Sequence, residues 1–453
     1  MERIDLHYSE KEIEEKIKSF KENPKSYNEE MLKIIQVKGS KYYLLSKNLR
    51  KIYDKIKEIT LENNHDEYKA YSTIFGAFLG SSLGSYCEFT HYFPLNYKNI
   101  FQGPNVFGCP PGQITGDSEM ALSMAYAIMD NPDSNNLNSD LLYYYYGNWM
   151  KSSPIDIGRT TINALKHFSY ENFNVESKGV FESSVRSLVA KVNHNSLSNG
   201  FLMRISPFVA WYYYKNKNSI IEDLKSKDGE KFFKLFTKIT KSVTIDNETT
   251  HSNEEVFIAS GVFVFMALNA MCDYSPKEIL ENIQLLVSHK GFMEGAFCTV
   301  KHIITGYLKL FESRFFDQEK FFKGVSDKNI GHYVHAIRLT LYFLYFFDEI
   351  EECSNYSKYR EIMNQICNCG GDTDTNAAIV GCVIGPIIGF DNFGKELSTL
   401  LLYSPKKRPF YTSAMIYFFV NFLEESNKET TTPAECRYNT FKAFMTLLNV
   451  EMK

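Results

Sequence analysis

The stretch CGGDTDTNAAIVG, residues 369–381, is the most informative part of this chain. Asp372 and Asp374 stand two residues apart, Thr375 adds a hydroxyl, and the two preceding glycines permit a tight turn that would direct three oxygens to one point. Hard oxygen ligands suit magnesium, manganese or calcium, and an apolar helix expected to begin near Thr375 would place its positive end beside them. The same residue types are ordinary helix caps, so the motif alone leaves both interpretations open.

A second segment, GQITGDSEMALSMA at residues 112–125, repeats this layout. Thr115, Asp117 and Ser118 cluster three oxygens at the start of another apolar helix. Taken alone this is again a candidate helix cap, but the two segments together could form the halves of one cation site.

Helical periodicity dominates the rest of the chain and predicts an all-α, compact multi-helix fold. Apolar residues recur at three-and-four spacing within residues 253–271, 330–347 and 376–389, whereas strand-type alternation is scarce. The apolar runs 256–271 and 377–390 fall short of the roughly 20 residues of a membrane span, so we expect core helices. Residues 1–66, rich in Lys and Glu, read as a helical N-terminal extension of a main domain at 67–453.

Size and composition favour a globular protein with a compact ligand. The 453 residues are 44% hydrophobic, which allows a large core, and a net charge of −4 indicates no nucleic-acid or membrane partner. The N-terminal residues lack the pattern of a secretory signal, and the nine cysteines are scattered. We therefore expect reduced thiols and a cytoplasmic location, with the nucleus also open, and we interpret Cys367 and Cys369 as buried thiols in preference to zinc ligands.

Six motifs in order resemble the ADP-ribosylglycohydrolase family, which includes hydrolases that remove ADP-ribose from protein arginine or serine. They are GAFLGSSLGSYCEF (76–89), TGDSEM (115–120), YGNWMKSSPIDIGRTT (146–161), SNGFLMRISP (198–207), THSN (250–253) and GGDTDT (370–375). The resemblance implies an all-helical fold with a central cleft for two Mg2+ ions, with Mn2+ as a substitute. It also implies an ADP-ribosylated protein or a related ADP-ribose conjugate as the substrate.

The family pattern also assigns roles to the metal-binding motifs. It places one metal on Thr115 and Asp117 and the other on Asp372 and Thr375, with Asp374 as the bridge. The arrangement implies that both motifs face one cleft.

Further positions of the pattern suggest catalytic and substrate-binding residues. Glu88 matches the residue that closes over the metal site, and Asp156 matches a suspected general acid or base; we take both as catalytic candidates. Asn199, Gly200 and His251 match positions near bound ADP-ribose. From the residues alone, Asp156 could instead be a turn residue and His251 a structural one. Arg204, in an apolar setting, is expected to satisfy internal carbonyls or a carboxylate.

Two positions depart from the family pattern. Gly116 stands where a second aspartate is usual, and Ser81 replaces a common acid. A missing carboxylate weakens a magnesium site, although water or Glu119 could fill the gap, and Gly116→Asp would be expected to tighten magnesium binding. Two metals with one weakly held, a single metal, or loss of catalysis all stay open. We expect retained hydrolysis; the alternatives are a catalytically impaired ADP-ribose binding module and a structural protein on the same scaffold.

Overall fold

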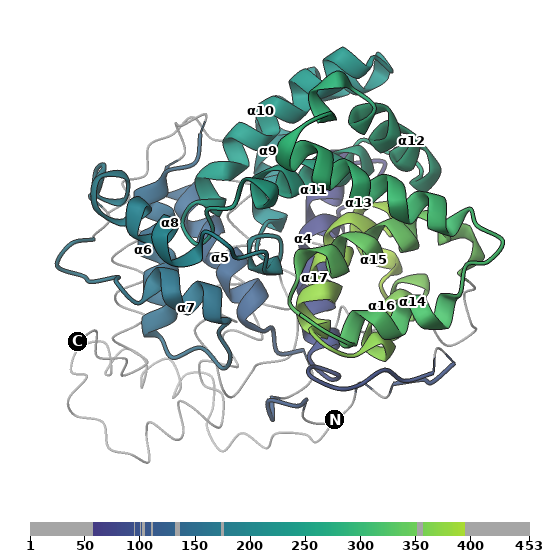
Figure 1. Ribbon diagram of the computed structural model, residues 1–453, viewed down its shortest axis with the longest axis horizontal. Coiled ribbons are helices and arrows are strands. Elements are labelled where there is room, and N and C mark those ends of the chain that lie inside the picture. The colour runs from purple at the N-terminus through teal and green to yellow at the C-terminus, as the bar shows by residue number, and fades with distance from the viewer. Residues whose placement is uncertain are drawn as a thin grey trace.

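The computed structural model describes residues 58–394, apart from 95, 100, 102–104, 110–111, 132–135, 174–175 and 351–356. Within these residues the fold is all-α, as predicted, with fourteen α-helices and one isolated antiparallel bridge between Ser198 and His332 (Figure 1). Most of the expected extension at 1–66, and the end of the expected domain beyond 394, lie outside the described residues. Helix α4 begins at His65, so the boundary predicted after residue 66 falls inside its first turn.

The helices are labelled as in Figure 1. Their bounds are α4 His65–Gly84, α5 Gly116–Met129, α6 Ser139–Lys151, α7 Arg159–Leu165, α8 Arg186–Asn193, α9 Ser206–Lys225, α10 Gly229–Asn247, α11 Glu254–Met271, α12 Pro276–Val287, α13 Gly295–Phe311, α14 Gln318–Ser326, α15 Tyr333–Tyr345, α16 Lys358–Cys369 and α17 Thr373–Ile388. Short segments of tighter or wider helix occur at Phe181–Val185, Asn199–Phe201, Lys290–Phe292, Phe347–Glu349 and Phe390–Asn392.

Helices α4 and α17 run antiparallel through the middle of the molecule with their backbones in contact (Figure 1). Glycines at four-residue spacing on α4 make this approach possible. A Cβ added at Gly76, Gly80 or Gly84 would lie 2.2, 2.3 or 2.4 Å from a carbonyl oxygen of Gly381, Ala377 or Thr373, respectively. The C-terminal end of α4 is therefore held directly against the N-terminal end of α17.

The two apolar runs expected to be core helices are buried within the protein. Helix α11 is long and apolar enough to cross a membrane by length and composition, but 83% of its most apolar window is buried inside the fold. It packs against α4, α17, α9 and α10. Helix α17 is buried from Thr373 to Pro386. Both helices thus bury their apolar side chains against other helices, which confirms the sequence-based expectation.

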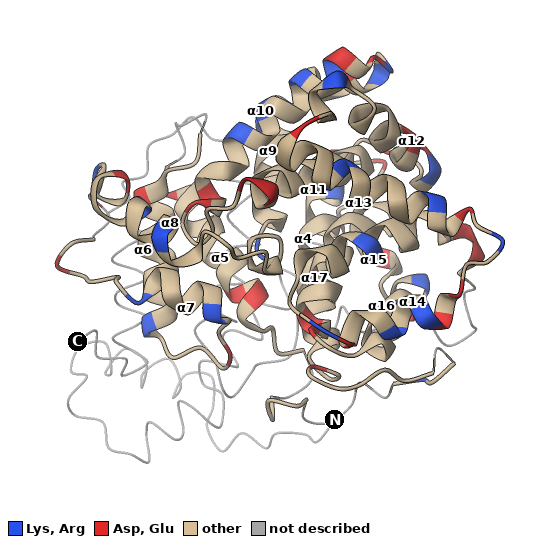
Figure 2. Ribbon diagram, viewed as in Figure 1, with Lys and Arg blue, Asp and Glu red and all other residues tan. Residues whose placement is uncertain are grey.

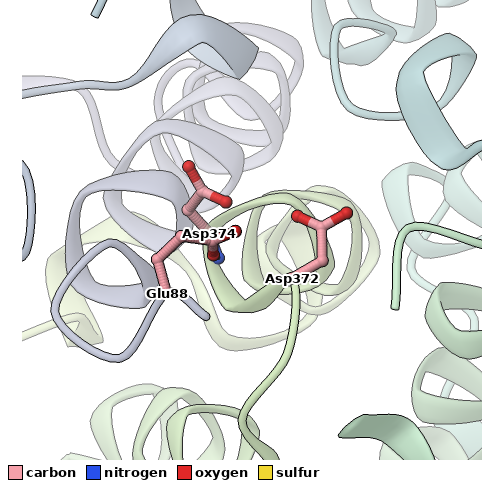
Figure 3. A group of neighbouring side chains, drawn as sticks. All are labelled: Glu88, Asp372 and Asp374. Carbon is pink, nitrogen blue, oxygen red and sulfur yellow. The ribbon is translucent and has the colours of Figure 1, made fainter. Parts of the chain in front are cut away.

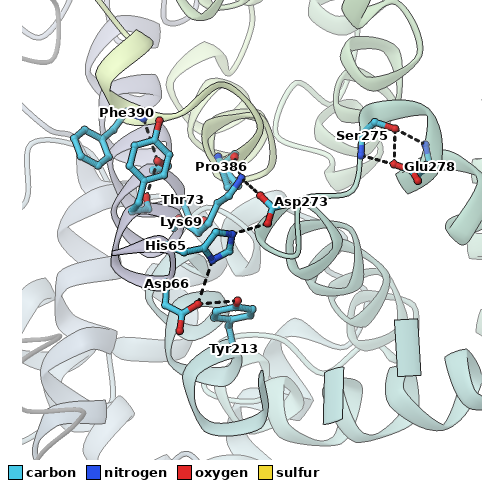
Figure 4. A network of polar contacts seen from close by, with 12 residues as sticks. His65, Asp66, Lys69, Thr73, Tyr213, Asp273, Ser275, Glu278, Pro386 and Phe390 are labelled. Atoms are coloured by element: carbon cyan, nitrogen blue, oxygen red, sulfur yellow. Dashed lines mark hydrogen bonds and ion pairs between the residues drawn. The ribbon is translucent and has the colours of Figure 1, made fainter. Parts of the chain in front are cut away.

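Polar contacts join the other ends of α4 and α17 (Figure 4). The Lys69 ammonium lies 2.6 Å from Asp273 Oδ1 and donates to the Pro386 carbonyl oxygen at 2.8 Å. Asp66 accepts from the Tyr213 hydroxyl of α9 at 3.1 Å. The Lys69–Pro386 contact joins α4 to α17 at the end remote from the two acidic motifs, and the other contacts tie α4 to α9 and to Asp273 just beyond the end of α11.

The interior also contains one ion pair that was expected from the sequence. Arg204 is fully buried, and its Nε donates to Asp246 Oδ2 at 3.0 Å while Nη2 donates to Thr250 Oγ1 at 2.9 Å. Arg204 is therefore structural, as predicted. Elsewhere, charged residues lie mainly on the outer helices, and Figure 2 shows basic and acidic residues interspersed on this side of the described chain.

The expectation of buried thiols at Cys367 and Cys369 is also confirmed. Both side chains are fully buried at the end of α16, and the Cys369 thiol donates to the Gln365 carbonyl oxygen at 3.3 Å.

Candidate active site

Glu88 reaches the start of α17 from the loop that follows α4. Its Oε2 accepts from the backbone N–H groups of Thr373 at 2.8 Å and Asp374 at 3.1 Å. The Glu88 carboxylate therefore satisfies the otherwise unpaired N–H groups of the first turn of α17. Helix α4 ends at Gly84, four residues before Glu88, and this lets the chain turn so that Glu88 faces α17.

The residues after Glu88 are joined to the glycine turn before α17. The Phe89 N–H donates to the Gly371 carbonyl at 2.8 Å, and the Gly371 N–H donates to the Thr90 carbonyl at 2.9 Å. Gly370 and Gly371 have φ of 68° and 78°, so the predicted tight turn is present in a conformation that favours glycine. A side chain at Gly370 would also collide with the Thr90 carbonyl oxygen, 2.4 Å from its Cβ.

Neither acidic motif uses its N-cap side chain to cap its own helix. Asp372 occupies the N-cap position of α17, and α17 begins at Thr373, two residues before the predicted start. Thr115 occupies the N-cap position of α5, and neither side chain makes a capping hydrogen bond. The capping interpretation, left open by the sequence, therefore does not explain why these oxygens are there.

Instead, the two motifs meet in one acidic cluster. Glu88, Asp372 and Asp374 each offer a carboxylate oxygen within 4.8 Å of the others, where the end of α4 meets the start of α17 (Figure 3). Asp117 joins them because the Thr375 hydroxyl donates to Asp117 Oδ1 at 3.0 Å. The sequence-predicted positions Asp117, Asp372, Asp374 and Thr375 are thus brought together.

Thr115 supports Asp117 from behind. Its hydroxyl donates to Asp117 Oδ2 at 3.0 Å and shares a hydrogen bond of 2.7 Å with Ser81 Oγ. Ser81, where an acid is usual in the family pattern, here positions Thr115. Thr115 does not line the cavity described below, so in this structure it orients Asp117 and does not face the ligand space.

The cluster carries an unusual concentration of buried negative charge. Burial, followed by the charges of Asp374 and Asp372, raises the pKa of Glu88 and the pKa of Asp117 well above their usual range. Burial and the charge of Asp374 raise the pKa of Asp372 to about 7. Among the described residues, no Lys, Arg or His forms an ion pair with any of these carboxylates.

A cavity of about 270 Å³ opens beside the cluster. Its acidic floor comprises Glu88, Asp117, Asp372 and Asp374. A second wall carries hydroxyl groups and one cation, from Arg159, Thr160, Thr161 and Ser198. Arg159 is the only cationic residue among the described residues that line the cavity. The cavity therefore has an anionic part suited to cations and a polar part suited to anions.

Two of the residues expected near the ligand line this cavity. The Asn199 side-chain amide donates to Asp372 Oδ2 at 2.8 Å, which holds that carboxylate in place. At Gly200, the missing side chain leaves open space, since a Cβ there would come no closer than 3.7 Å to His251 Cε1 and 3.8 Å to Ser198 Oγ.

His251, the third residue expected near the ligand, lies directly behind two cavity-lining residues and does not line the cavity itself. It is fully buried behind the cavity wall, where its Nε2 lies 2.9 Å from Ser198 Oγ and its Nδ1 lies 2.8 Å from Thr250 Oγ1. Burial lowers the pKa of its imidazole to about 3, so the ring is neutral. His251 supports Ser198 and makes no direct contact with the ligand space in this structure.

Asp156, the other catalytic candidate, lies at the rim of the cavity with an exposed side chain. Partial desolvation raises its pKa, with a smaller contribution from the charge of Asp374. A carboxylate that is open to solvent yet near the cluster can exchange protons with water.

The surroundings of Gly116 leave little room for a side chain. A Cβ at Gly116 would lie 3.3 Å from Trp149 Cζ2 and 3.4 Å from the Asp156 carbonyl oxygen. The Trp149 indole N–H donates to Glu119 Oε2 at 2.7 Å. Glu119 therefore holds the tryptophan and does not replace the missing carboxylate, which corrects one of the sequence-based options. Trp149 fills the space that an aspartate would need.

Several residues that line the cavity were not selected from the sequence, and the largest side chains among them belong to Phe89, Trp149 and Arg159. Trp149 and Arg159 lie within the quoted stretch 146–161, and Phe89 ends the stretch 76–89. Their proximity to the acids is set by tertiary packing, although the quoted motifs already contained them.

An all-α fold with a buried acidic cluster at two helix N-termini defines a helical protein with a candidate site for divalent cations. The sequence profile of the ADP-ribosylglycohydrolase family matches residues 62–409. The L543 protein of Acanthamoeba polyphaga mimivirus, provisionally named an ADP-ribosyl glycohydrolase, is 28% identical over 335 residues, which are 72% of this chain and 88% of that protein. A solved structure described as an ADP-ribosylglycohydrolase-related protein complex shares the fold, with a TM-score of 0.52 at 17% identity, over 79% of this chain and 99% of that one. The chain belongs to the ADP-ribosylglycohydrolase family.

Proposed function

We propose that this protein is a metal-dependent hydrolase that cleaves the glycosidic bond between ADP-ribose and a protein side chain, arginine or serine, or a related conjugate. The observation that carries the proposal is the convergence of Glu88, Asp117, Asp372 and Asp374 on one cavity. These carboxylates come from the α4–α5 connection, from α5 and from the start of α17, so only the folded chain brings them together.

The donor set fits hard divalent cations. Buried carboxylates that lack a cationic partner destabilise a fold unless they bind protons or metal ions. Oxygen donors of this kind favour Mg2+, with Mn2+ as an alternative. Asp117, Asp372 and Asp374 would hold the ions, with Thr375 contributing its hydroxyl. Two sites are proposed, and the one nearest Gly116 is the weaker because it has one carboxylate fewer. When bound, cations there would fix the ribose hydroxyls and stabilise charge as the glycosidic bond breaks.

The second wall of the cavity supports a diphosphate-containing ligand. The guanidinium of Arg159 and the hydroxyls of Thr160, Thr161 and Ser198 are donors that suit phosphate oxygens. A ligand with a ribose at the acidic floor and phosphates at this wall matches the chemistry of ADP-ribose. Asn199 and Gly200 would contact it beside Asp372.

Asp156 is the better placed of the two catalytic candidates for proton transfer. Oε2 of Glu88 already accepts from two backbone N–H groups, which commits this carboxylate to organising the site. The Asp156 carboxylate has a backbone hydrogen bond with its neighbour Ile157, lies at the rim of the cavity and has a raised pKa. We infer that Asp156 activates water or protonates the departing side chain, while Glu88 closes the metal site.

The test measures release of ADP-ribose from ADP-ribosylated arginine and serine peptides with Mg2+, with Mn2+ and with a chelator. Wild-type protein should release ADP-ribose from at least one peptide, and the chelator should abolish release. Asp374→Asn, which keeps the shape but removes the central charge, should reduce kcat by about 100-fold or more. As a matched control, Asp228→Asn at the N-cap of α10 should leave the rate unchanged, since asparagine caps as well as aspartate. Metal-independent turnover, or full activity of Asp374→Asn, would refute the proposal.

A second candidate function, an ADP-ribose binding module without catalysis, is favoured by one observation: Gly116 leaves one carboxylate missing. This candidate predicts that the protein binds ADP-ribosylated peptide in the presence of Mg2+ and releases nothing. The same assay therefore separates the two functions.

A further inference from the structure

Phe89 combines three features that folding alone does not explain. Its side chain is 59% exposed, its backbone has φ of 60°, and it lines the cavity beside the acidic cluster. Bulky residues rarely adopt positive φ, because the Cβ is crowded by the backbone. A residue with a strained backbone and an exposed ring contributes little to the stability of the fold.

The protein nevertheless holds Phe89 firmly in this position. The residue before it, Glu88, is anchored on the start of α17, and the Phe89 N–H donates to the Gly371 carbonyl at 2.8 Å. One edge-to-face contact with Phe107, at 6.3 Å between ring centroids, supports the ring. Strained residues that are fixed by their surroundings concentrate at ligand-binding sites.

The position of the ring relative to the cluster indicates what it would contact. If the proposed function holds, the ribose that carries the scissile bond lies at the acidic floor and the diphosphate lies toward Arg159. The group attached across that bond must then leave through the mouth of the cavity. Phe89 directly follows Glu88, lines the cavity and exposes more than half of its side chain, so it lies where the cavity opens to solvent.

We propose that Phe89 is a specificity residue that binds the protein part of the substrate, namely the modified side chain and its adjoining peptide. This inference rests on the proposed function and deepens it. A flat apolar face packs well against aliphatic side-chain carbons, peptide planes and guanidinium groups. The protein would thereby prefer ADP-ribose attached to a polypeptide over conjugates with small leaving groups.

The experiment compares a ligand that has the protein part with one that lacks it. Phe89→Ala should raise KM for an ADP-ribosylated peptide by about 3- to 10-fold, the usual range for one aromatic contact. It should leave the affinity for free ADP-ribose and the response of thermal stability to Mg2+ unchanged. Phe89→Tyr, which keeps the ring, should retain the wild-type KM.

Two controls separate the ring from the backbone and from general surface effects. Phe89→Gly removes both the ring and the strain, so it should resemble Phe89→Ala in KM while melting at a higher temperature than Phe89→Ala. Phe315→Ala removes a ring that is 78% exposed and does not line this cavity, and it should change neither measurement.

The outcomes are distinct. Equal weakening of ADP-ribose and of the peptide conjugate would mean that Phe89 contacts the nucleotide, and an unchanged KM would mean that it contacts neither; both overturn the inference. If wild-type protein releases no ADP-ribose, the proposed function fails. Equilibrium binding of the uncleaved peptide conjugate then tests the role of Phe89. Phe89→Ala should still erase any preference for the conjugate over free ADP-ribose. A preference that survives the substitution would overturn the inference.

Discussion

Gly116 has little room beside it for the side chain of the aspartate that is usual at this position of the family pattern. The Cβ that an aspartate would bring lies 3.3 Å from Trp149 Cζ2, a contact tighter than most side chains make. Trp149 cannot easily move away because its indole is bonded to the buried Glu119. A carboxylate at position 116 would therefore crowd Trp149 in this protein.

This packing changes what Gly116→Asp should do. The single substitution should lower the free energy of unfolding by about 1–3 kcal/mol through overpacking, and should not tighten Mg2+ binding. The double variant Gly116→Asp with Trp149→Phe frees space for the carboxylate and should bind Mg2+ about 10-fold more tightly than Trp149→Phe alone. Titration calorimetry and urea unfolding measure both effects. Gly116→Ala is the steric control, and a tighter Mg2+ site in the single variant without loss of stability would contradict this account.

Residue types and spacing were enough to identify the core of the candidate site. Asp372, Asp374 and Thr375 were found because a turn followed by a helix start converges oxygens locally, and Asp117 because it repeats that layout. A structural role for His251 was one of the options, but the contacts of Glu119 and His251 were not predictable, since each depends on which way a buried side chain points. Glu119 turns to Trp149 and His251 to Ser198, and sequence spacing carries no information on either contact.

At the scale of elements, the site depends on how closely α4 and α17 approach. Helix periodicity predicted the apolar helices, but the start of α17 was placed two residues late. The reason is that α17 is capped by Glu88, which is 285 residues away along the chain from Thr373. A local pattern cannot reveal a cap that comes from a loop so distant in the sequence. The sequence shows the four-residue spacing of the glycines in α4, but not that α17 is the helix that packs against them.

Gly80→Ala tests this element packing directly. Its Cβ would lie 2.3 Å from the Ala377 carbonyl oxygen, so the helices must separate, and the substitution should destabilise the protein by about 3 kcal/mol. Separation would also move Glu88 away from α17 and weaken Mg2+ binding. Gly306→Ala is the matched control: this glycine lies within α13 with nothing within 4 Å of its Cβ, so alanine should stabilise by about 0.5–1 kcal/mol. Urea unfolding that gave the same sign for both variants would contradict the close-packing argument.

At the scale of the whole molecule, the acidic cluster links stability to metal ions and to pH. Burial raises the pKa of Asp372 from 3.8 to about 7, so without metal the folded state binds more protons than the unfolded state between these values. The contribution of protonated Asp372 to stability is fully present below pH 3.8 and is lost as the pH rises through about 7. A bound cation offsets this loss of stability at high pH because it stabilises the charged carboxylates.

We therefore expect Mg2+ to raise the melting temperature, and to raise it more at pH 8 than at pH 5.5, where protons compete for the same oxygens. At 100 times its Kd, a ligand that binds only the folded state adds about 2.7 kcal/mol, which is a shift of several degrees. The effect of Asp374→Asn on the melting temperature should depend on the metal. With a chelator the variant should melt higher than wild type, because the substitution relieves repulsion among buried acids. Adding Mg2+ should then raise its melting temperature little further. A melting temperature of Asp374→Asn that fell below wild type in chelator would mean that the carboxylate is held by protein contacts alone. The sign of that difference thus separates a site built for a cation from an acidic cluster that the fold already satisfies.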